Sequence, residues 1–351
     1  MAKVPGLAEM ARSIVADGKG ILAADETPKT ITKRLVARGI TSTPETRREH
    51  RELLFTAPGI TDFIGGVITQ DETIHQKSAT GVPLAEVISR RGLVPGIKVD
   101  KGVVSLAGAP GERVTEGLDG LRERLEEYFQ LGARFAKWRA VFRITEKLPS
   151  RACVHANAHA LARYAALCQE QGLVPIVEPE VLMDGAHGIE RCDEVTGDVL
   201  GEVFKELIGQ HVMLEGMLLK PNMVIPGQDN PKKAPVAVVA RATLRTLQRC
   251  VPAAVPGVVF LSGGQSPVEA TEHLNAINAL DGPKPWKLSF SFGRALQDEA
   301  LDAWKGRAQN VPAVQLAFLE RARCVAAAAQ GKYRSEMERD IAKAQPAADI
   351  H

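Results

Sequence analysis

The sequence lacks a strong excess of charge and any long apolar segment. The formal net charge at pH 7 is +2, which provides no bulk electrostatic field for binding nucleic acid or an anionic membrane. No apolar run approaches the ~18 residues that a membrane-spanning helix requires. The opening stretch, MAKVPGLAEMARSIVADGKG, has neither an apolar core nor the small-residue cleavage pattern of a secretory signal. The sequence therefore predicts a cytoplasmic protein without nucleic-acid or membrane partners.

Cysteine and histidine are also scarce in the patterns that mark disulfide and metal sites. The five cysteines are odd in number and form no CxxC pair, so we expect reduced thiols rather than a disulfide framework or a zinc site. None of the eight histidines falls at the carboxyl end of an expected strand. His155 and His159 share a helix face at i, i+4 and could form a metal pair, but the sequence shows no third ligand beside them. We expect no catalytic metal.

Eight short and mostly apolar runs alternate with stretches of helical periodicity. The expected strands are residues 21–25, 64–69, 96–100, 135–139, 174–180, 212–220, 257–262 and 287–292. Between them, stretches such as 119–132 and 155–172 repeat apolar residues at helical spacing and end at glycine. Strands that are buried on both faces and alternate with helices predict an α/β fold, a (β/α)8 TIM barrel.

The chain has no break in composition, so we expect a single domain over residues 1–351 with its barrel core at about 18–333. An extra helix is predicted within residues 1–17, and another helix, 313–330, should pack outside the barrel. Residues 334–351 are predicted to form a flexible tail.

Polar residues end most of the expected strands. Lys220 directly follows Met217, Leu218 and Leu219, and a buried ammonium group is costly unless it is paired or loses its proton. The other polar residues at strand ends are Asp25, Lys98, Asp100, Lys137, Arg139, Glu178, Glu180, Ser262 and Ser291. One such residue alone is usually a solvated loop residue, but the carboxyl ends of barrel strands meet on one face, where active sites form. Lysines gathered there without a metal or redox centre indicate Schiff-base chemistry.

Two glycine-bearing loops indicate where phosphate would bind. LSGGQS (261–266) follows the seventh expected strand, and SFGRA (291–295) follows the eighth. Gly263 and Gly264 would let backbone N–H groups approach an anion, and Arg294 could add a charge-assisted hydrogen bond. A glycine pair by itself often only makes a tight turn, but loops after strands seven and eight frequently bind phosphate in TIM barrels.

Several stretches in order along the chain carry a family resemblance. They are GKGILAADE (18–26), GIKVDKG (96–102), FAKWR (135–139), VPIVEPE (174–180), LEGMLLKPNMV (214–224), FLSGGQS (260–266) and SFGRAL (291–296). The chain resembles the class I, Schiff-base-forming fructose-1,6-bisphosphate aldolases. The resemblance implies reversible cleavage of fructose 1,6-bisphosphate to dihydroxyacetone phosphate and glyceraldehyde 3-phosphate in glycolysis and gluconeogenesis. It also implies a homotetramer that needs no cofactor.

The resemblance assigns roles residue by residue. Lys220 is implied as the Schiff-base lysine, Glu178 as the general acid/base, Lys137 as the neighbouring cation and Asp25 as the base for the C4 hydroxyl. Glu180 is grouped with these catalytic candidates. Ser262, Gly263, Gly264, Ser291, Gly293 and Arg294 are implied at one phosphate site, and Thr27, Thr30, Arg34, Lys98 and Arg139 at the second phosphate or the substrate hydroxyls. Burial and the charge of Lys137 are expected to favour the neutral, nucleophilic amine of Lys220.

Two features depart from the family pattern. Thr27 stands where the family usually has serine, which keeps a hydroxyl but changes its surroundings. The chain ends in PAADIH rather than in the tyrosine that assists enamine protonation in many members. We therefore expect that enamine protonation is slower or differently assisted, or that another group takes over the step; slow protonation would be seen as a burst of aldehyde release before slow ketone release.

Three other functions fit parts of the pattern. A transaldolase-like or deoxyribose-phosphate aldolase-like enzyme would also use a barrel lysine, but it would not need two phosphate sites. A metal-dependent aldolase would need histidine ligands at the barrel mouth. A catalytically silent binding protein would be expected to have lost Lys220, Glu178 or Asp25, and all three are present.

Overall fold

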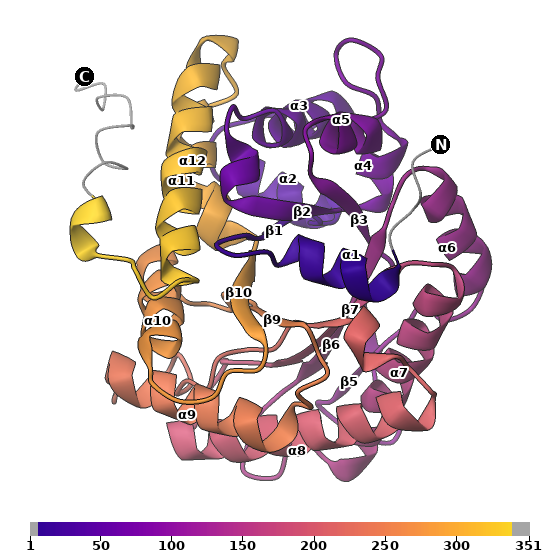
Figure 1. The fold of residues 1–351 in the computed structure, drawn as a ribbon, viewed down its shortest axis with the longest axis vertical. Helices are drawn as coiled ribbons and strands as arrows, with labels where there is room; N and C mark the ends of the chain where they lie inside the picture. The colour runs from indigo at the N-terminus through magenta and orange to yellow at the C-terminus, as the bar shows by residue number, and fades with distance from the viewer. Residues whose placement is uncertain (1–5, 339–351) are drawn as a thin grey trace.

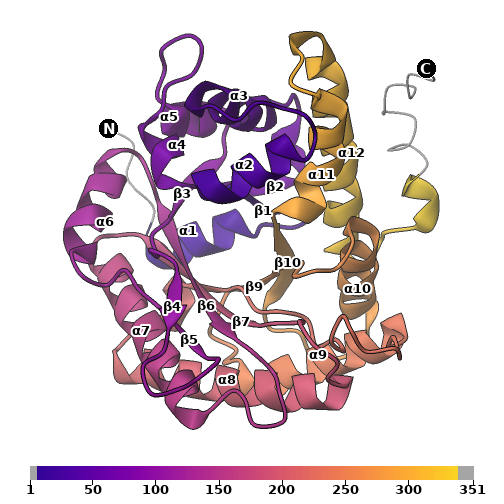
Figure 2. The same cartoon turned by 180° about the vertical axis from the view of Figure 1, so that it is seen from behind.

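The computed structural model describes residues 6–338, in which eight parallel strands close into a barrel. The strand order around the barrel is β1-β10-β9-β8-β7-β6-β3-β2. These strands are β1 (Gly20–Ala23), β2 (Ile64–Thr69), β3 (Val94–Lys98), β6 (Phe135–Phe142), β7 (Val174–Val181), β8 (Leu218–Leu219), β9 (Gly257–Phe260) and β10 (Lys287–Phe292). Helices surround the strands on the outside (Figures 1 and 2). The predicted TIM barrel is confirmed.

The helices begin at capping signals that are visible in the sequence. The Ser150 hydroxyl accepts a hydrogen bond from the Cys153 amide at the start of α7, and Ser266 with Glu269 forms a capping box at the start of α10. The helices are α1 (Leu7–Ile14), α2 (Pro28–Val36), α3 (Pro44–Phe55), α4 (Asp71–His75), α5 (Leu84–Arg90), α6 (Leu121–Gln130), α7 (Arg151–Glu170), α8 (Ile189–Gly209), α9 (Val236–Cys250), α10 (Pro267–Ala279), α11 (Arg294–Trp304) and α12 (Val311–Ala328). No helix within residues 6–338 is both long and apolar enough to cross a membrane.

The structure corrects the expected strands in two places. The run 212–220 was expected to be one strand, but only Leu218–Leu219 (β8) pairs in the barrel, after a 3-10 turn at Leu214–Gly216. β8 ends at Leu219; the Lys220 amide still donates a hydrogen bond to the Val177 carbonyl, and Pro221 has no N–H to continue the ladder. The antiparallel hairpin of β4 (Val103–Ser105) and β5 (Arg113–Thr115) was not expected, because each strand has only three residues, too few to show a strand pattern in the sequence.

The barrel interior is filled by side chains on one face of each strand. Ile21, Phe135, Ile176 and Leu218 pack there against α1, which lies across the amino-terminal end of the barrel. Gly96 leaves room for the Phe135 ring, since a Cβ atom at Gly96 would lie 2.2 Å from it. The interior is therefore a packed core, and any site must lie at the carboxyl-terminal end of the strands.

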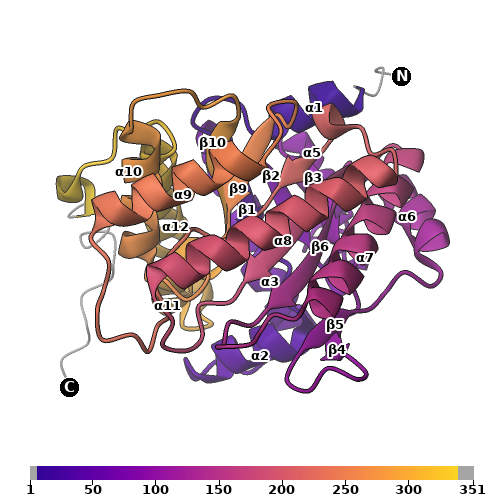
Figure 3. The same cartoon turned by 90° about the horizontal axis from the view of Figure 1, so that it is seen from below.

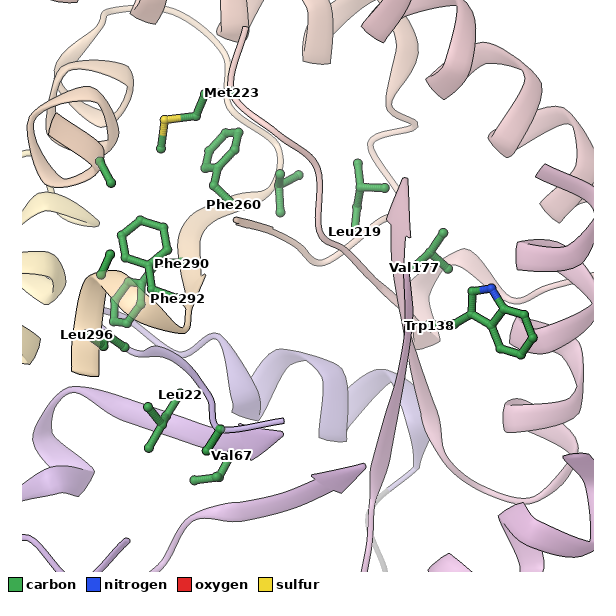
Figure 4. Packing of buried hydrophobic residues seen from close by; sticks show 14 of the residues in the cluster. Leu22, Val67, Trp138, Val177, Leu219, Met223, Phe260, Phe290, Phe292 and Leu296 are labelled. Atoms are coloured by element: carbon green, nitrogen blue, oxygen red, sulfur yellow. The ribbon is translucent and has the colours of Figure 1, made fainter. Parts of the chain in front are cut away.

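Residues of opposite parity face outward and pack beneath the helices. Figure 4 shows Leu22, Trp138, Val177, Leu219 and Phe260 in this outer layer. Because side chains alternate along a strand, each strand contributes one row to the interior and one to this layer. That alternation explains why the strand sequences are apolar on both faces.

The segment after α12 folds back onto that helix at Glu338. Arg321 in α12 is buried and pairs with Glu299 at 2.8 Å and with Glu338 at 2.7 Å. Glu338, which the sequence placed in the flexible tail 334–351, is thus held by a buried arginine. The remainder of that predicted tail, 339–351, lies outside the described residues.

His50 in α3 should make the fold sensitive to mild acid. It is buried, stacks on Trp304 with ring centroids 5.5 Å apart, and lies 3.3 Å from Gln297 Oε1. Burial, with the charge of Arg34, lowers the pKa of His50 to about 3. In the unfolded chain His50 becomes protonated near pH 6.5, whereas in the folded protein it stays neutral down to about pH 3. The free energy of unfolding is therefore unaffected by His50 above pH 6.5 and decreases as the pH falls from 6.5 toward 3.

We expect His50→Phe, which keeps the ring stacking, to flatten the pH dependence of the free energy of unfolding between pH 6.5 and 4. Between pH 6.5 and 4, the variant should lose less unfolding free energy than the wild type by an amount on the order of 3 kcal/mol. Urea denaturation across that range measures it, with the half-exposed His75→Phe as control. An unchanged pH slope in His50→Phe would contradict the assignment.

Candidate active site at the barrel mouth

Continuing each interior row of side chains toward the carboxyl ends of the strands leads from apolar to charged residues. Phe135 is followed by Lys137 on the same face of β6, Ile176 by Glu178 on β7, and Leu218 by Lys220 at the end of β8. The sequence thus places these groups on neighbouring strands pointing into the barrel. The structure brings together Lys220, Glu178, Lys137 and Asp25, as the sequence predicted.

These four groups form a buried chain of alternating charge. Lys137 Nζ lies 2.6 Å from Asp25 Oδ2 and 3.1 Å from Glu178 Oε2. Lys220 Nζ lies 3.2 Å from Glu178 Oε1. Glu178 Oε2 is buried and, despite its contact with Lys137, has no aligned hydrogen bond. The sequence predicted a nearby charge from Lys137 acting on Lys220, and the structure places the Glu178 carboxylate between the two amines.

The protonation of the cluster follows from burial opposed by charge pairing. Burial alone would raise the pKa of Asp25, but Lys137 and Lys220 outweigh it and lower that pKa to about 2. Burial likewise acts to raise the pKa of Glu178, and the same two lysines lower it. Burial would lower the pKa of Lys137, but Asp25 and Glu178 raise it far above its usual value. At neutral pH the site therefore holds two carboxylates beside a permanently charged Lys137.

A second pair of ionic contacts lines the same mouth. Arg139 Nε is bonded to Glu180 Oε2, and Lys98 Nζ lies 2.5 Å from Asp100 Oδ1. Asp100 also accepts hydrogen bonds from the backbone amides of Gly102 and Arg139, so it contacts the Lys98 ammonium and holds the main chain at Arg139. The sequence marked Asp100 only as a strand end. Its position two residues after Lys98, on the same side of the chain, was the available signal.

Another positioning residue was missed at the end of β8. The buried Asn222 accepts a hydrogen bond from the Val181 amide at 3.0 Å and donates one to Thr196 Oγ1 at 3.1 Å. These bonds fix the segment after Lys220 against β7 and α8. The asparagine stands in the stretch KPN, directly beyond the lysine that it helps to place.

The loops after β9 and β10 meet and leave polar groups for an anion. Arg294 donates a hydrogen bond to the Gly263 carbonyl at 2.7 Å, and Gly263 has a φ of 59°, which favours glycine. Ser291 Oγ is buried without a hydrogen-bond partner, and Ser262 is also buried. Gly264 lies in the same loop as Gly263, and Gly293 directly precedes α11. An unpartnered hydroxyl beside a helix amino terminus suits a phosphate group.

Thr27 and Thr30 lie at the amino terminus of α2. Thr27 caps the helix by accepting a hydrogen bond from the Thr30 amide, and the two hydroxyl oxygens are 3.1 Å apart. Beside Thr27 and Lys98 opens a cavity of about 430 Å³. Arg34 is bound to Glu26 and lies 3.0 Å from Asp298, so its guanidinium is occupied by protein carboxylates.

Outside the barrel mouth, the structure places further possible metal ligands beside His155 and His159. Glu202 and Glu206 of α8 lie beside these histidines of α7. The expectation that no third ligand stands near them came from sequence distance alone and does not hold in space. The five cysteines are free thiols.

Comparisons with known proteins point in one direction. The family model described as glycolytic, class I fructose-bisphosphate aldolase matches residues 6–349. Cytosolic fructose-bisphosphate aldolase 4 of Arabidopsis thaliana is 55% identical over 321 residues, covering 92% of this chain and 82% of the relative. A probable class 1 fructose-bisphosphate aldolase of Xanthomonas axonopodis pv. citri is 55% identical over 329 residues, covering 93% and 98%.

A solved structure shows the same likeness in three dimensions. It is fructose-bisphosphate aldolase from Plasmodium falciparum in a ternary co-crystal with TRAP and a small-molecule inhibitor. It superposes with a TM-score of 0.92 at 50% identity, covering 94% of this chain and 95% of that chain.

Proposed function

Since the chain belongs to the class I fructose-bisphosphate aldolase family, we propose that Lys220 forms the Schiff base through which it acts. The protein is a lyase that reversibly cleaves fructose 1,6-bisphosphate into dihydroxyacetone phosphate and glyceraldehyde 3-phosphate, a step of glycolysis. Class I aldolases use a lysine Schiff base and need no metal. The observation that carries the assignment to Lys220 is its contact with Glu178 inside the buried charge chain.

In the proposed first half-reaction, Glu178 acts as the general base and then the general acid for Lys220. The two groups are 3.2 Å apart, so Glu178 can take the proton of Lys220 and release the neutral amine. The amine attacks the C2 ketone, and Glu178 returns a proton to the C2 hydroxyl, which leaves as water. Glu178 Oε2, which has no aligned hydrogen bond, is available for this exchange. Lys137 stays charged throughout and stabilises the carboxylate form.

In the second half-reaction, the iminium accepts the electron pair of the C3–C4 bond. Asp25, ionised at neutral pH, takes the proton of the C4 hydroxyl as that bond breaks. Glyceraldehyde 3-phosphate leaves, and the enamine on Lys220 is protonated and hydrolysed to dihydroxyacetone phosphate. Asp25 Oδ2 lies 2.6 Å from Lys137 Nζ, which also contacts Glu178, so Lys137 positions the carboxylates used in both half-reactions.

Two phosphate-binding sites, one for each end of the substrate, would position the C3–C4 bond for cleavage. We assign Ser262, Gly263, Gly264, Ser291, Gly293 and Arg294 to one phosphate site. We assign Thr27, Thr30, Lys98 and Arg139 to the other phosphate or the hydroxyls. Arg34 would join them only after exchanging its bonds to Glu26 and Asp298. Glu180 would serve by orienting Arg139.

Replacing Arg294 should weaken substrate binding specifically. A charge-assisted hydrogen bond contributes roughly 1.5–3 kcal/mol, so Arg294→Met should lower kcat/KM for fructose 1,6-bisphosphate by about 10- to 100-fold, mainly through KM. Steady-state kinetics measure this, with the exposed Arg307→Met as a matched control. An unchanged KM would exclude Arg294 from the phosphate site.

The assembly and the cellular location are also part of this proposal. Several relatives are named as cytosolic enzymes, which supports a cytosolic location. The family resemblance supports a homotetramer. We propose further that residues 1–351 form one domain, since strands and helices alternate around a single barrel.

Chemical trapping tests the proposal directly. The protein is incubated with dihydroxyacetone phosphate and EDTA, reduced with borohydride, digested and mapped by mass. An adduct on Lys220 that forms without metal is expected. Turnover that EDTA abolishes, with no adduct, would establish a metal-dependent aldolase instead. A folded protein with neither adduct nor turnover would favour a silent binding protein.

A further inference from the structure

A cluster of two histidines and two glutamates lies where α7 and α8 run side by side on the outside of the barrel (Figure 3). His155 and His159 are one helical turn apart on α7, and Glu202 and Glu206 are one turn apart on α8. Both pairs face the same groove, because each histidine contacts a glutamate of the other helix. We call these four residues the α7–α8 cluster.

Three atoms of the cluster have the separations of metal ligands. His155 Nδ1 lies 3.0 Å from Glu202 Oε1 and 3.5 Å from Glu206 Oε1. One ligand atom from each of these residues falls within 4.8 Å of the others. Two ligands of a tetrahedral zinc ion with bonds of about 2.0–2.1 Å are about 3.3 Å apart. The three groups can therefore close on one ion after side-chain shifts of less than an ångström or so.

His159 has the position of a residue that orients a ligand. Its Nδ1 lies 2.9 Å from Glu206 Oε2, the carboxylate oxygen that does not face His155. The two imidazole rings stack with centroids 6.3 Å apart. An outer hydrogen bond of this kind fixes a ligating carboxylate and strengthens metal binding.

The surroundings favour a cation and leave a path for it. Two carboxylates face one histidine, and Lys205 Nζ lies 3.1 Å from Glu202 Oε1. Lys205 is about two-thirds exposed, so its contact with Glu202 is weak and a dication can displace it. A cavity of about 340 Å³ opens beside Glu202, and its lining also includes Asp198 and two arginines, Arg151 and Arg191.

We propose that the α7–α8 cluster is a zinc-binding site, with His155, Glu202 and Glu206 as ligands and His159 as the residue that positions Glu206. Imidazole with two carboxylates suits Zn²⁺, whereas Mg²⁺ and Ca²⁺ prefer oxygen ligands alone. The ion would tie α7 to α8 on the outer surface of the barrel. It takes no part in the Schiff-base reaction, whose groups lie inside the barrel mouth.

Calorimetric titration of the untagged full-length protein with ZnCl₂ tests the site. We expect saturable binding of one equivalent that MgCl₂ does not compete with. His155→Ala and Glu202→Gln should each weaken it more than tenfold. His159→Ala should weaken it roughly tenfold by loosening Glu206. Lys205→Met should tighten it about two- to fivefold by removing the competing cation.

His75→Ala provides the matched control. His75 also contacts two carboxylates, but it reaches Asp71 and Glu127 through different ring nitrogens, so they cannot share one ion. This variant should bind zinc as the wild type does. Zinc should also raise the Tm of the wild type and not of His155→Ala. Binding that survives in His155→Ala, or the absence of binding at 1 mM ZnCl₂, would overturn the proposal.

Aldolase turnover keeps this test separate from the proposed catalytic roles. The cluster variants should cleave fructose 1,6-bisphosphate at the wild-type rate, with or without EDTA. A cluster variant that loses zinc and keeps turnover supports the site whatever the fate of the Lys220 assignment.

Discussion

Lys220→Met should abolish cleavage of fructose 1,6-bisphosphate and leave a folded protein. Without an amine no iminium forms, and the electron pair of the C3–C4 bond has no acceptor. We expect kcat to fall by at least about 10⁴-fold, as for other covalent nucleophiles. The methionine fills a similar volume, and Glu178 keeps Lys137 as its counter-charge. Steady-state kinetics together with thermal unfolding measure both effects.

The control for this variant is Lys287→Met. Lys287 begins β10 at the opposite end of the barrel, where it pairs with Asp17 on the surface. It should retain full turnover and full trapping by borohydride. Normal turnover in Lys220→Met, or a reduced adduct on a different lysine in that variant, would refute the assignment of Lys220.

Lys137→Met should reduce stability more than any other substitution in the site. Lys137 is buried between Asp25 and Glu178. Its removal takes away the cation in contact with Asp25 and leaves Lys220 in contact with Glu178, while Lys98 and Arg139 act on the two carboxylates only from a greater distance. Loss of one partner from a buried ion pair typically costs about 3–5 kcal/mol. We expect a loss of that size in the free energy of unfolding at pH 7, measured by urea denaturation. Turnover should fall by roughly 10²- to 10⁴-fold.

The pH dependence of this loss identifies its cause. In the wild type the lowered pKa of Asp25 means that its stabilisation is present above about pH 4 and lost as the pH falls toward 2. In Lys137→Met, burial without the Lys137 charge should raise the carboxylate pKa values above those of the unfolded chain. The free energy of unfolding of the variant then increases as the pH falls from 7 toward 5. The difference in unfolding free energy between the variant and the wild type becomes smaller over the same range.

A second substitution separates charge from packing. Asp25→Asn combined with Lys137→Met removes one of the two stranded carboxylates and should recover part of the lost stability at pH 7. Lys220→Met is the matched lysine variant, and it should lose less, because Lys220 contacts only Glu178 in this cluster. If Lys137→Met and Lys220→Met lost the same unfolding free energy at every pH, the loss would come from packing and not from unpaired charge.

The charged groups at the barrel mouth were predictable because strand alternation is local in sequence, while their catalytic roles came from the family resemblance and stay predictions. Phe135 and Lys137, or Ile176 and Glu178, are two residues apart, so each pair shares a face as soon as the strand is recognised. Eight such strands predict a barrel, and a barrel places all carboxyl ends at one mouth. The exact length of β8 was not predicted, because most residues of the run 212–220 are apolar and the interruption at Glu215 and Gly216 was not interpreted as the end of an unpaired segment.

The sequence by itself determined the barrel, the family and the set of charged residues at the mouth, since these depend on periodicity and on short motifs. Only the tertiary structure decided how those charges pair: that Glu178 bridges Lys137 and Lys220, and that Arg34 is bound by Glu26 and Asp298. The same holds for the α7–α8 cluster, whose glutamates lie more than 40 residues from His155. Such contacts depend on the angle and register at which separate elements pack, which no local pattern specifies.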